Sequence, residues 1–277
     1  MRIQELLEIG ANELKNKKIE NPISIAKQLM CFVTGKDKIY LITNANTELK
    51  NEQEKLFLNA INKVAQNIPL QYITNKQEFM KMDFYVDENV LIPRADTEIA
   101  VEEAINIINE NNLTNVLDMC TGSGAIAISI AKYTEKCNIT AVDISPKALE
   151  VARKNAIYNN TITIEFICSN MFENVNGKYD LIISNPPYIR KNVIKTLDEN
   201  VKKEPILALD GGDDGLDFYR NLERNAYKFL NENGYLVLEI GFDQQEEVTK
   251  LLQNKYKDII CKKDLGGNDR VIICKRR

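Results

Sequence analysis

The tetrapeptide Asn185-Pro186-Pro187-Tyr188 is the part of this chain best suited to chemistry. It follows the apolar run Tyr179–Ser184, which indicates a buried strand. Both prolines fix φ and lack an N–H, and a residue before a proline is held extended. The Asn185 side chain and the Pro186 carbonyl can therefore face one small group. Two acceptors held in this way suit a planar –NH2 group that must be desolvated, oriented and made nucleophilic.

An ordinary turn after a strand would also explain this tetrapeptide. A second motif, earlier in the chain, weighs against that interpretation. Residues 116–127 have the pattern of a strand, a glycine turn and the start of a helix. Gly122 and Gly124 let the backbone turn sharply and approach a ligand closely. The spacing also fits the dinucleotide-binding fingerprint, so the turn alone does not identify the ligand.

Polar and apolar side chains at the ends of the next two predicted strands suit a nucleoside. Asp143 ends the second strand, where a carboxylate can accept hydrogen bonds from both hydroxyls of a ribose. Its alternative role is to cap the helix that follows, and Ser145 can do that instead. After the third strand, Asn170 could pair with an adenine amino group, with Met171 and Phe172 forming an apolar slot for the ring. Phe172 alone would more often be a core residue.

Short apolar runs alternate with helical stretches throughout the second half of the chain, which predicts a mostly parallel sheet covered by helices on both faces. The last two strands have no helix between them, so we expect the final strand to enter antiparallel, as a hairpin. The predicted strands are 116–119, 139–142, 164–168, 181–184, 235–240, 259–262 and 271–274, and the predicted helices are 125–132, 146–159, 216–230 and 244–255.

The beginning of the chain has a different pattern. Apolar residues between Leu56 and Ile68 recur at three-four spacing, which predicts a helix that Pro69 ends. Residues 1–75 are expected to form a helical bundle, and partner docking is its functional interpretation. Residues 76–92 are expected to form a hairpin linker, and residues 93–277 the main domain. A helix through about residue 108 would be capped by Asp96 or Thr97.

Composition limits the kinds of chemistry that remain. The chain has 277 residues, is 44% hydrophobic, carries a formal net charge of -4 and contains no histidine. The absence of histidine and of a Cys-x-x-Cys pair excludes Ser-His-Asp and Cys-His catalysis and zinc sites of the usual spacing, so no metal is expected. Without a Lys/Arg-rich tract, a protein or small molecule is a better partner than nucleic acid. The cysteines in apolar runs, with no membrane-length segment or signal peptide, indicate a cytoplasmic protein.

Nicotinamide dinucleotide and S-adenosylmethionine both contain adenosine, so the tetrapeptide decides between them. Hydride-transfer enzymes often supply a proton donor such as histidine or Tyr-x-x-x-Lys, and nothing else here favours that chemistry. Methyl transfer to a planar nitrogen needs the acceptors that residues 185–188 offer.

The motifs together resemble a known family. Asp-Met-Cys-Thr-Gly-Ser-Gly at 118–124 is similar to the first motif of class I S-adenosylmethionine methyltransferases, and Asn-Pro-Pro-Tyr to that of enzymes methylating amide or exocyclic amino nitrogen. Together with six further motifs, they resemble the HemK family, the peptide chain release factor glutamine N5-methyltransferases. These further motifs are Pro69-Leu-Gln-Tyr, Ile92-Pro-Arg-Ala-Asp-Thr-Glu, Glu204-Pro, Gly211-Gly-Asp-Asp-Gly-Leu, Phe218-Tyr-Arg and Glu239-Ile-Gly.

The resemblance implies a fold, a cofactor and a partner. The fold is a Rossmann-like α/β class I methyltransferase sheet of seven strands, mostly parallel with the last strand antiparallel, and a small N-terminal helical domain joined by a β-hairpin. The donor is S-adenosyl-L-methionine, with S-adenosyl-L-homocysteine as product. The methyl acceptor is the glutamine of the Gly-Gly-Gln loop of bacterial class 1 release factors, without membrane or direct nucleic acid contact.

The resemblance also implies roles for individual residues. Asn185, Pro186, Pro187 and Tyr188 would hold the glutamine amide, with Asn185, Pro186 and Tyr188 catalytic and Tyr188 packed on the amide plane. The cofactor-binding residues would be Cys120, Thr121, Gly122, Ser123, Gly124, Asp143, Met171, Phe172 and Asn185. The chain departs from the family where Cys120 replaces the usual glycine, Asn170 a frequent aspartate, Met171 a frequent aromatic and Ala95 a common proline.

Some alternatives stay open from sequence alone. An adenine-N6 methyltransferase would use the same acceptors, and a non-catalytic nucleoside-binding or NAD-binding domain would share the glycine turn. Arg94 and Glu98 could border the cleft or simply form ion pairs at a helix start. The glycines between Gly211 and Gly215 predict a flexible loop that could shape a peptide groove.

Overall fold

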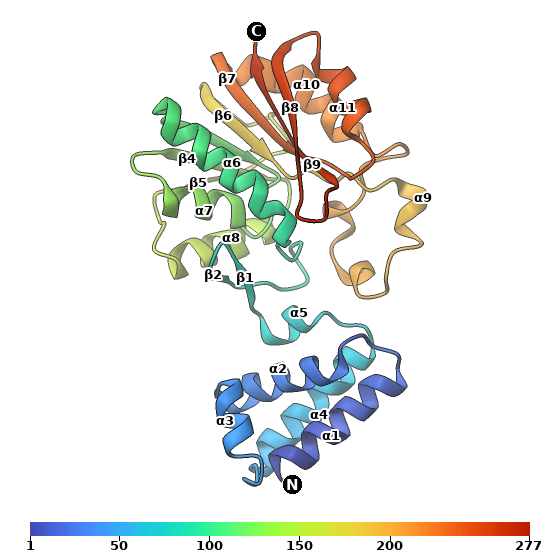
Figure 1. Ribbon diagram of the computed structural model, residues 1–277. Helices are drawn as coiled ribbons and strands as arrows, with labels where there is room; N and C mark the ends of the chain where they lie inside the picture. Colours follow the sequence, from blue (N-terminus) through green and yellow to red (C-terminus); the bar gives the residue numbers. More distant parts are fainter. The chain divides into compact units, whose positions relative to one another are not determined.

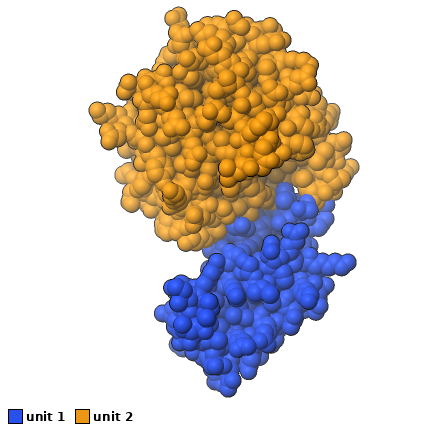
Figure 2. Space-filling view, viewed as in Figure 1, with its two compact units in different colours: residues 1–75, 198–203 blue, residues 76–197, 204–277 orange.

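The computed structural model describes residues 1–277, and the chain forms two units. One unit comprises residues 1–75 with 198–203, and the other comprises 76–197 with 204–277 (Figure 2). Each unit has its own apolar core. None of the helices is long and apolar enough to cross a lipid bilayer.

The first unit is built from helices, as the sequence predicts. Its core joins side chains such as Leu6, Leu29 and Phe57, which come from three different helices and are fully buried. The expected end of the long helix at Pro69 is wrong: the helix ends at Ala65, and Pro69 instead precedes a further short helix. The elements are α1 (Ile3–Asn16), α2 (Pro22–Thr34), α3 (Lys38–Thr43), α4 (Asn51–Ala65), α5 (Leu70–Thr74) and the 3-10 turn η1 (Val201–Lys203) (Figure 1).

A seven-stranded sheet in the order β5-β4-β3-β6-β7-β9-β8 forms the centre of the second unit. β9 pairs antiparallel with both neighbours and all other pairs are parallel, which confirms the predicted fold class and the terminal hairpin. The strands are β3 (Asn115–Met119), β4 (Asn138–Asp143), β5 (Glu165–Cys168), β6 (Tyr179–Ser184), β7 (Leu230–Glu239), β8 (Tyr256–Lys263) and β9 (Asp269–Arg276).

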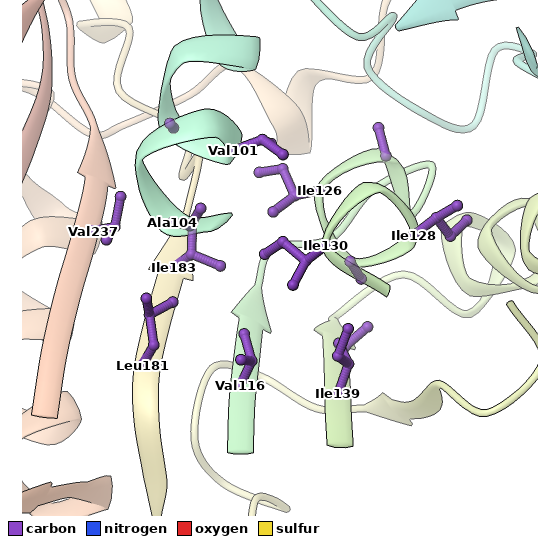
Figure 3. Packing of buried hydrophobic residues seen from close by; sticks show 14 of the residues in the cluster. Val101, Ala104, Val116, Ile126, Ile128, Ile130, Ile139, Leu181, Ile183 and Val237 are labelled. Atoms are coloured by element: carbon purple, nitrogen blue, oxygen red, sulfur yellow. The ribbon is translucent and has the colours of Figure 1, made fainter. Parts of the chain in front are cut away.

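Helices cover both faces of this sheet, because the strand residues that point to each face are apolar. Val116, Leu181 and Ile183 pack under α6 and α7, where they meet residues such as Val101 and Ile126 (Figure 3). Their neighbours in sequence face α10 and α11 on the other side. The helices are α6 (Ala95–Asn111), α7 (Ala125–Tyr133), α8 (Pro146–Tyr158), α9 (Lys191–Ile194), α10 (Asp217–Phe229) and α11 (Gln245–Leu252), with the 3-10 turn η2 (Ile206–Ala208).

Several expected boundaries differ from the structure. α6 begins at Ala95 with Arg94 as its N-cap, so neither Asp96 nor Thr97 caps it. β7 begins at Leu230 rather than residue 235, because Leu230 pairs with Tyr179 across a register shift despite the turn-like residues between. The hairpin formed by β1 (Gln77–Phe79) and β2 (Met82–Phe84) is also shorter than the segment 76–92 that was expected to form it.

Asn155 on α8 ties the segment after this hairpin to the glycine turn. Its side chain is fully buried and makes three hydrogen bonds to backbone. Its Oδ1 accepts from Tyr85 N at 2.7 Å, and its Nδ2 donates to Tyr85 O and to Ser123 O, each at 2.9 Å. One amide therefore satisfies three backbone groups that have no strand partner, and holds two distant segments together.

Replacing Asn155 should destabilise the second unit. Asn155→Ala leaves those three backbone groups without their partner, and the expected loss is about 2–4 kcal/mol of unfolding free energy. Urea denaturation followed by circular dichroism measures it. The exposed Lys147 on the same helix is the control, and Lys147→Ala should cost about 0.5 kcal/mol or less. Equal stability of the two variants would contradict the assignment.

Candidate active site

A pocket opens at the edge of the sheet where β3, β4, β5 and β6 end, the place where open parallel sheets bind ligands. It brings together residues from both motifs that the sequence singles out. Its lining is mostly apolar, with a few polar groups. The lining residues are Asn89, Val90, Leu91, Met119, Cys120, Gly122, Val142, Asp143, Ile144, Ser145, Ala148, Ser169, Asn170, Met171, Asn185, Pro187, Pro205, Leu207, Ala208 and Phe218.

A fully buried carboxylate holds the glycine turn in shape. Asp118 Oδ2 accepts hydrogen bonds from the Thr121 hydroxyl at 2.5 Å and from Ala127 N at 3.2 Å. Burial raises the pKa of Asp118 to about 7. Gly122, with φ of +55°, has open space where a Cβ would stand, so a ligand can approach its backbone. Gly124 meets Ala152 of α8 closely, so its role here is helix packing.

Asp143 connects the glycine turn to the start of α8. Its Oδ2 accepts from Gly122 N at 2.8 Å and its Oδ1 from Ser145 N at 2.9 Å. The Ser145 hydroxyl accepts from Ala148 N at 3.2 Å, so Ser145 caps the helix and Asp143 is free of that task. Burial raises the pKa of Asp143, while the backbone N–H groups act in the opposite direction. The carboxylate lines the pocket with further lone pairs available to hydroxyl groups.

Two sulfur atoms face each other on the pocket wall. Cys120 Sγ and Met171 Sδ lie 4.0 Å apart, and both residues have positive φ, +64° and +50°. Cys120 thus stands at a position whose backbone favours glycine. Burial raises the pKa of its thiol, so the side chain is a neutral packing group rather than a thiolate.

Several residues predicted to bind the cofactor lie behind the pocket wall. Phe172 stacks on Phe229 with ring centroids 4.9 Å apart, inside the core under α10, and does not line the pocket. Thr121 and Ser123 are buried in the turn itself. Their proposed contacts with the cofactor therefore stay predictions. Asn170 does line the pocket, and its Nδ2 donates to Glu173 Oε1 at 2.8 Å.

Asn185 lines the pocket from the end of β6. Its Nδ2 donates a hydrogen bond to Thr97 Oγ1 at 3.1 Å, which leaves the Oδ1 acceptor for a ligand. Pro187 lines the pocket beside it, and Pro186 is buried. From sequence, Thr97 is only a possible helix cap. Its contact with Asn185 could not be predicted from spacing, because 88 positions separate the two residues.

Tyr188, the last residue of the tetrapeptide, is half-buried and is not one of the residues that line the pocket. Its hydroxyl donates to Glu239 Oε1 at 3.4 Å, and its ring packs on the core under α10 and α11. Glu239 is 1% exposed, and burial raises the pKa of its carboxyl to about 7. The other carboxyl oxygen of Glu239, Oε2, is buried and has no hydrogen-bond partner.

The glycine-rich segment from Gly211 to Gly215 supports the tetrapeptide instead of forming a free loop. Gly211 N donates to Ile189 O at 2.9 Å, just after the tetrapeptide. Gln244 Nε2 bridges Tyr188 O at 3.1 Å and Gly215 O at 3.2 Å. A Cβ on Gly215 would lie 2.5 Å from Tyr188 O, so glycine is needed for this close approach.

Arg94 and Glu98 have structural partners. Arg94 pairs with the buried Glu204, whose Oε2 also accepts from Ile92 N at 3.1 Å. Glu98 Oε1 accepts from Met80 N in the hairpin. Neither residue lines the pocket. The ion pair instead joins two segments that do, 89–91 and 205–208, and neither segment was predicted to line a pocket, although Pro205 belongs to the Glu204-Pro motif.

The sheet order, the helices on both faces and a glycine turn beside an acidic strand end are those of the class I methyltransferase fold. Solved structures with this fold include ribosomal protein L11 methylase from Lactobacillus delbrueckii subsp. bulgaricus, at 21% identity and a TM-score of 0.52, covering 73% of this chain and 90% of that one. Another is T. thermophilus 16S rRNA N2 G1207 methyltransferase in complex with AdoMet and guanosine, at 14% identity, 73% and 50% coverage and a TM-score of 0.53.

Sequence comparison makes the assignment more specific. Residues 97–204 match the methyltransferase small domain, and residues 5–74 match the PrmC N-terminal domain. The release factor glutamine methyltransferase of Clostridium acetobutylicum is 40% identical over 282 residues, covering 100% of this chain and 99% of that protein. The chain belongs to the release factor glutamine methyltransferase family.

The close packing of Gly215 predicts a stability difference between two glycines. Gly215 and Gly177 both have positive φ, +77° and +88°, but a Cβ on Gly177 would meet nothing within 4 Å. Gly177→Ala should cost about 1–2 kcal/mol through backbone strain alone. Gly215→Ala should cost roughly 1–3 kcal/mol more, because the methyl group displaces Tyr188.

Thermal unfolding of both variants measures this difference. An equal decrease in Tm would mean that the glycine segment does not support the tetrapeptide.

Proposed function

We propose that this protein transfers the methyl group of S-adenosylmethionine to the side-chain amide nitrogen of a glutamine in a release factor. The proposed acceptor is the glutamine of the Gly-Gly-Gln loop in bacterial class 1 release factors. Membership of the family supports the reaction class and the partner. The geometry around Asn185 supports the residue roles.

The observation that carries the proposal is the hydrogen bond from Asn185 to Thr97. Because Nδ2 is engaged there, the Oδ1 acceptor of Asn185 is left available to whatever enters the pocket. Pro186 adds a backbone carbonyl that is rigidly placed by its ring and by the ring that follows. A carboxamide has two N–H groups that such a pair of acceptors can hold.

A glutamine amide nitrogen is a poor nucleophile, since its lone pair is delocalised into the carbonyl. Acceptance of both N–H groups by Asn185 Oδ1 and the Pro186 carbonyl aims the nitrogen and stabilises positive charge that grows on it. No strong base is needed, because the acidity of the N–H rises as the new bond forms and the proton can leave late. Tyr188 is proposed to pack on the amide plane; its hydroxyl bond to Glu239 fixes the ring.

The cofactor supplies an electrophilic methyl group on a sulfonium. The residues present fit its nucleoside part: Asp143 offers carboxylate lone pairs for two ribose hydroxyls, and Met171 offers a polarizable surface for adenine. Gly122 leaves room for close approach to the backbone. We assign Cys120 and Gly124, with the turn between them, to the methionine end.

The division of the chain is also part of this proposal. Residues 1–75 are assigned to docking of the release factor, residues 76–92 to a linker and residues 93–277 to methyl transfer. The match of residues 5–74 to the PrmC N-terminal domain supports the first assignment. A substrate of the translation apparatus also favours a cytoplasmic location.

Mass spectrometry of a purified release factor, after incubation with this protein and S-adenosylmethionine, tests the function. The expected product carries one added methyl group on the glutamine of its Gly-Gly-Gln loop. A parallel incubation with DNA and RNA should leave both unmethylated. Methylated adenine with an unmodified release factor would contradict the proposal.

Asn185→Ala tests the catalytic assignment. Loss of one preorganised acceptor should lower kcat by about 10²–10³-fold, while the Kd for S-adenosylmethionine changes much less. Steady-state methyl transfer and calorimetric titration measure the two quantities. Near-normal turnover in this variant would show that Asn185 does not hold the reacting amide.

Asp143→Asn tests the cofactor assignment. The variant keeps the shape but loses the charge and one acceptor, so the Kd for S-adenosylmethionine should rise about ten-fold or more. Glu150→Gln, an exposed charge removal on α8, is the matched control and should leave the Kd unchanged. Equal affinities in calorimetry would remove Asp143 from the cofactor site.

A further inference from the structure

We infer that Glu204 is a positioning residue for the cofactor, because its carboxylate holds together two segments of the pocket wall. These segments are residues 89–91 and 205–208, and both line the pocket. The inference rests on the proposed function, in which this pocket takes S-adenosylmethionine, and deepens it. Glu204 does not line the pocket itself, so it acts on the cofactor only through the wall.

Neither wall segment belongs to the sheet or to an α-helix. Residues 89–91 lie in an irregular stretch, and residues 206–208 form the short 3-10 turn η2. Leu207 lines the pocket although it is 64% exposed, so little of the protein packs over this part of the wall. Segments of this kind keep their place through a few specific links to their neighbours.

The segment 205–208 is anchored differently at its two ends. Just after it, Leu209 O accepts a hydrogen bond at 3.0 Å from Ile189 N, which follows the tetrapeptide. Just before it, residues 198–203 belong to the helical unit. Glu204 is therefore the residue at which the chain re-enters the second unit, and its side chain supplies the link at this end.

The link has a specific chemistry. The Glu204 side chain is 2% exposed, and each carboxylate oxygen accepts from a different donor. Oε2 accepts from Ile92 N at 3.1 Å, directly after the segment 89–91, and Oε1 accepts from the Arg94 guanidinium. Both partners are donors, and a carboxylate can accept from both. A glutamine of the same shape has one acceptor oxygen and would turn its own N–H groups toward the other donor.

The link should therefore affect the affinity for cofactor. Without it, the two segments occupy the arrangement that fits the cofactor for a smaller fraction of the time, and the measured Kd rises in proportion. The proposed hold on the substrate amide uses Asn185 at the end of β6, which the link does not contact. The loss should appear in cofactor binding far more than in turnover at saturating cofactor.

Glu204→Gln tests this by calorimetric titration and steady-state kinetics. The Kd for S-adenosylmethionine should rise about ten-fold, while kcat at saturating cofactor changes much less. This is the reverse of the pattern expected for Asn185→Ala. The matched control is Glu223→Gln, because Glu223 forms a partly buried ion pair with Lys255 at 2.9 Å and neither residue lines the pocket. Its Kd should equal that of the wild type.

Arg94→Ala provides a second variant that is less disturbing to the fold, since the Arg94 side chain is 41% exposed. It keeps the hydrogen bond from Ile92 to Glu204, so the Kd should rise less, by about three-fold. In the double variant the glutamine at position 204 no longer opposes a guanidinium. Its Kd should therefore be no higher than that of the weaker-binding single variant.

The outcomes separate this inference from the proposed function. A wild-type protein that does not bind S-adenosylmethionine would refute the cofactor assignment and the inference with it. A wild type that binds, with a folded Glu204→Gln or Arg94→Ala variant of unchanged Kd, would overturn the inference alone. A similar rise in Kd in Glu223→Gln, or effects that simply add in the double variant, would also overturn it.

Discussion

The orientation of one carboxamide is the constraint on which the site depends. The proposed hold on a substrate amide needs the Asn185 oxygen to face the pocket, and the hydrogen bond from Asn185 Nδ2 to Thr97 leaves that oxygen available. The surrounding residues hold the tetrapeptide rigidly. Its two prolines fix the backbone, the glycine segment from Gly211 to Gly215 lies against it, and Gln244 bridges the tetrapeptide and the glycine segment. A preorganised acceptor is effective because it does not have to reorient during the reaction.

On the proposed cofactor side of the pocket, buried carboxylates hold the backbone by accepting hydrogen bonds from its N–H groups. Asp118 and Asp143 each accept hydrogen bonds from backbone N–H groups, and both lose solvation on burial, which raises the pKa of each. The glycine turn needs such fixed partners, since glycine has no side chain to hold it in place. Convergence of the two halves of the site follows from parallel strands, whose carboxyl ends meet at one edge.

Local patterns were enough to predict the sheet, its final hairpin and the pocket residues Gly122, Asp143 and Met171, whereas Cys120 came only from the family resemblance. These features depend on alternation of apolar runs and on turn chemistry, which a single sequence records. Phe172 could not be placed in the same way, because an aromatic after a strand fits a core as well as a binding slot. The structure puts it against Phe229.

Long-range partners were beyond the reach of sequence alone. Thr97 and Asn185 lie 88 positions apart, and Asn155 reaches Tyr85 across 70. No residue pattern marks 89–91 or 205–208 as a pocket wall, and an ion pair between Arg94 and Glu204 brings the two segments together. The spacing of residue types along the chain predicts local structure, whereas contacts between residues far apart in sequence are seen only in the folded protein.

A crystal structure with S-adenosylhomocysteine and a glutamine peptide from the release factor loop tests the central claim most directly. The account predicts the glutamine amide nitrogen at about 2.9 Å from both Asn185 Oδ1 and the Pro186 carbonyl oxygen, with Asn185 Nδ2 still on Thr97. A glutamine amide bound elsewhere, or an Asn185 amide turned so that Nδ2 faces the substrate, would contradict it.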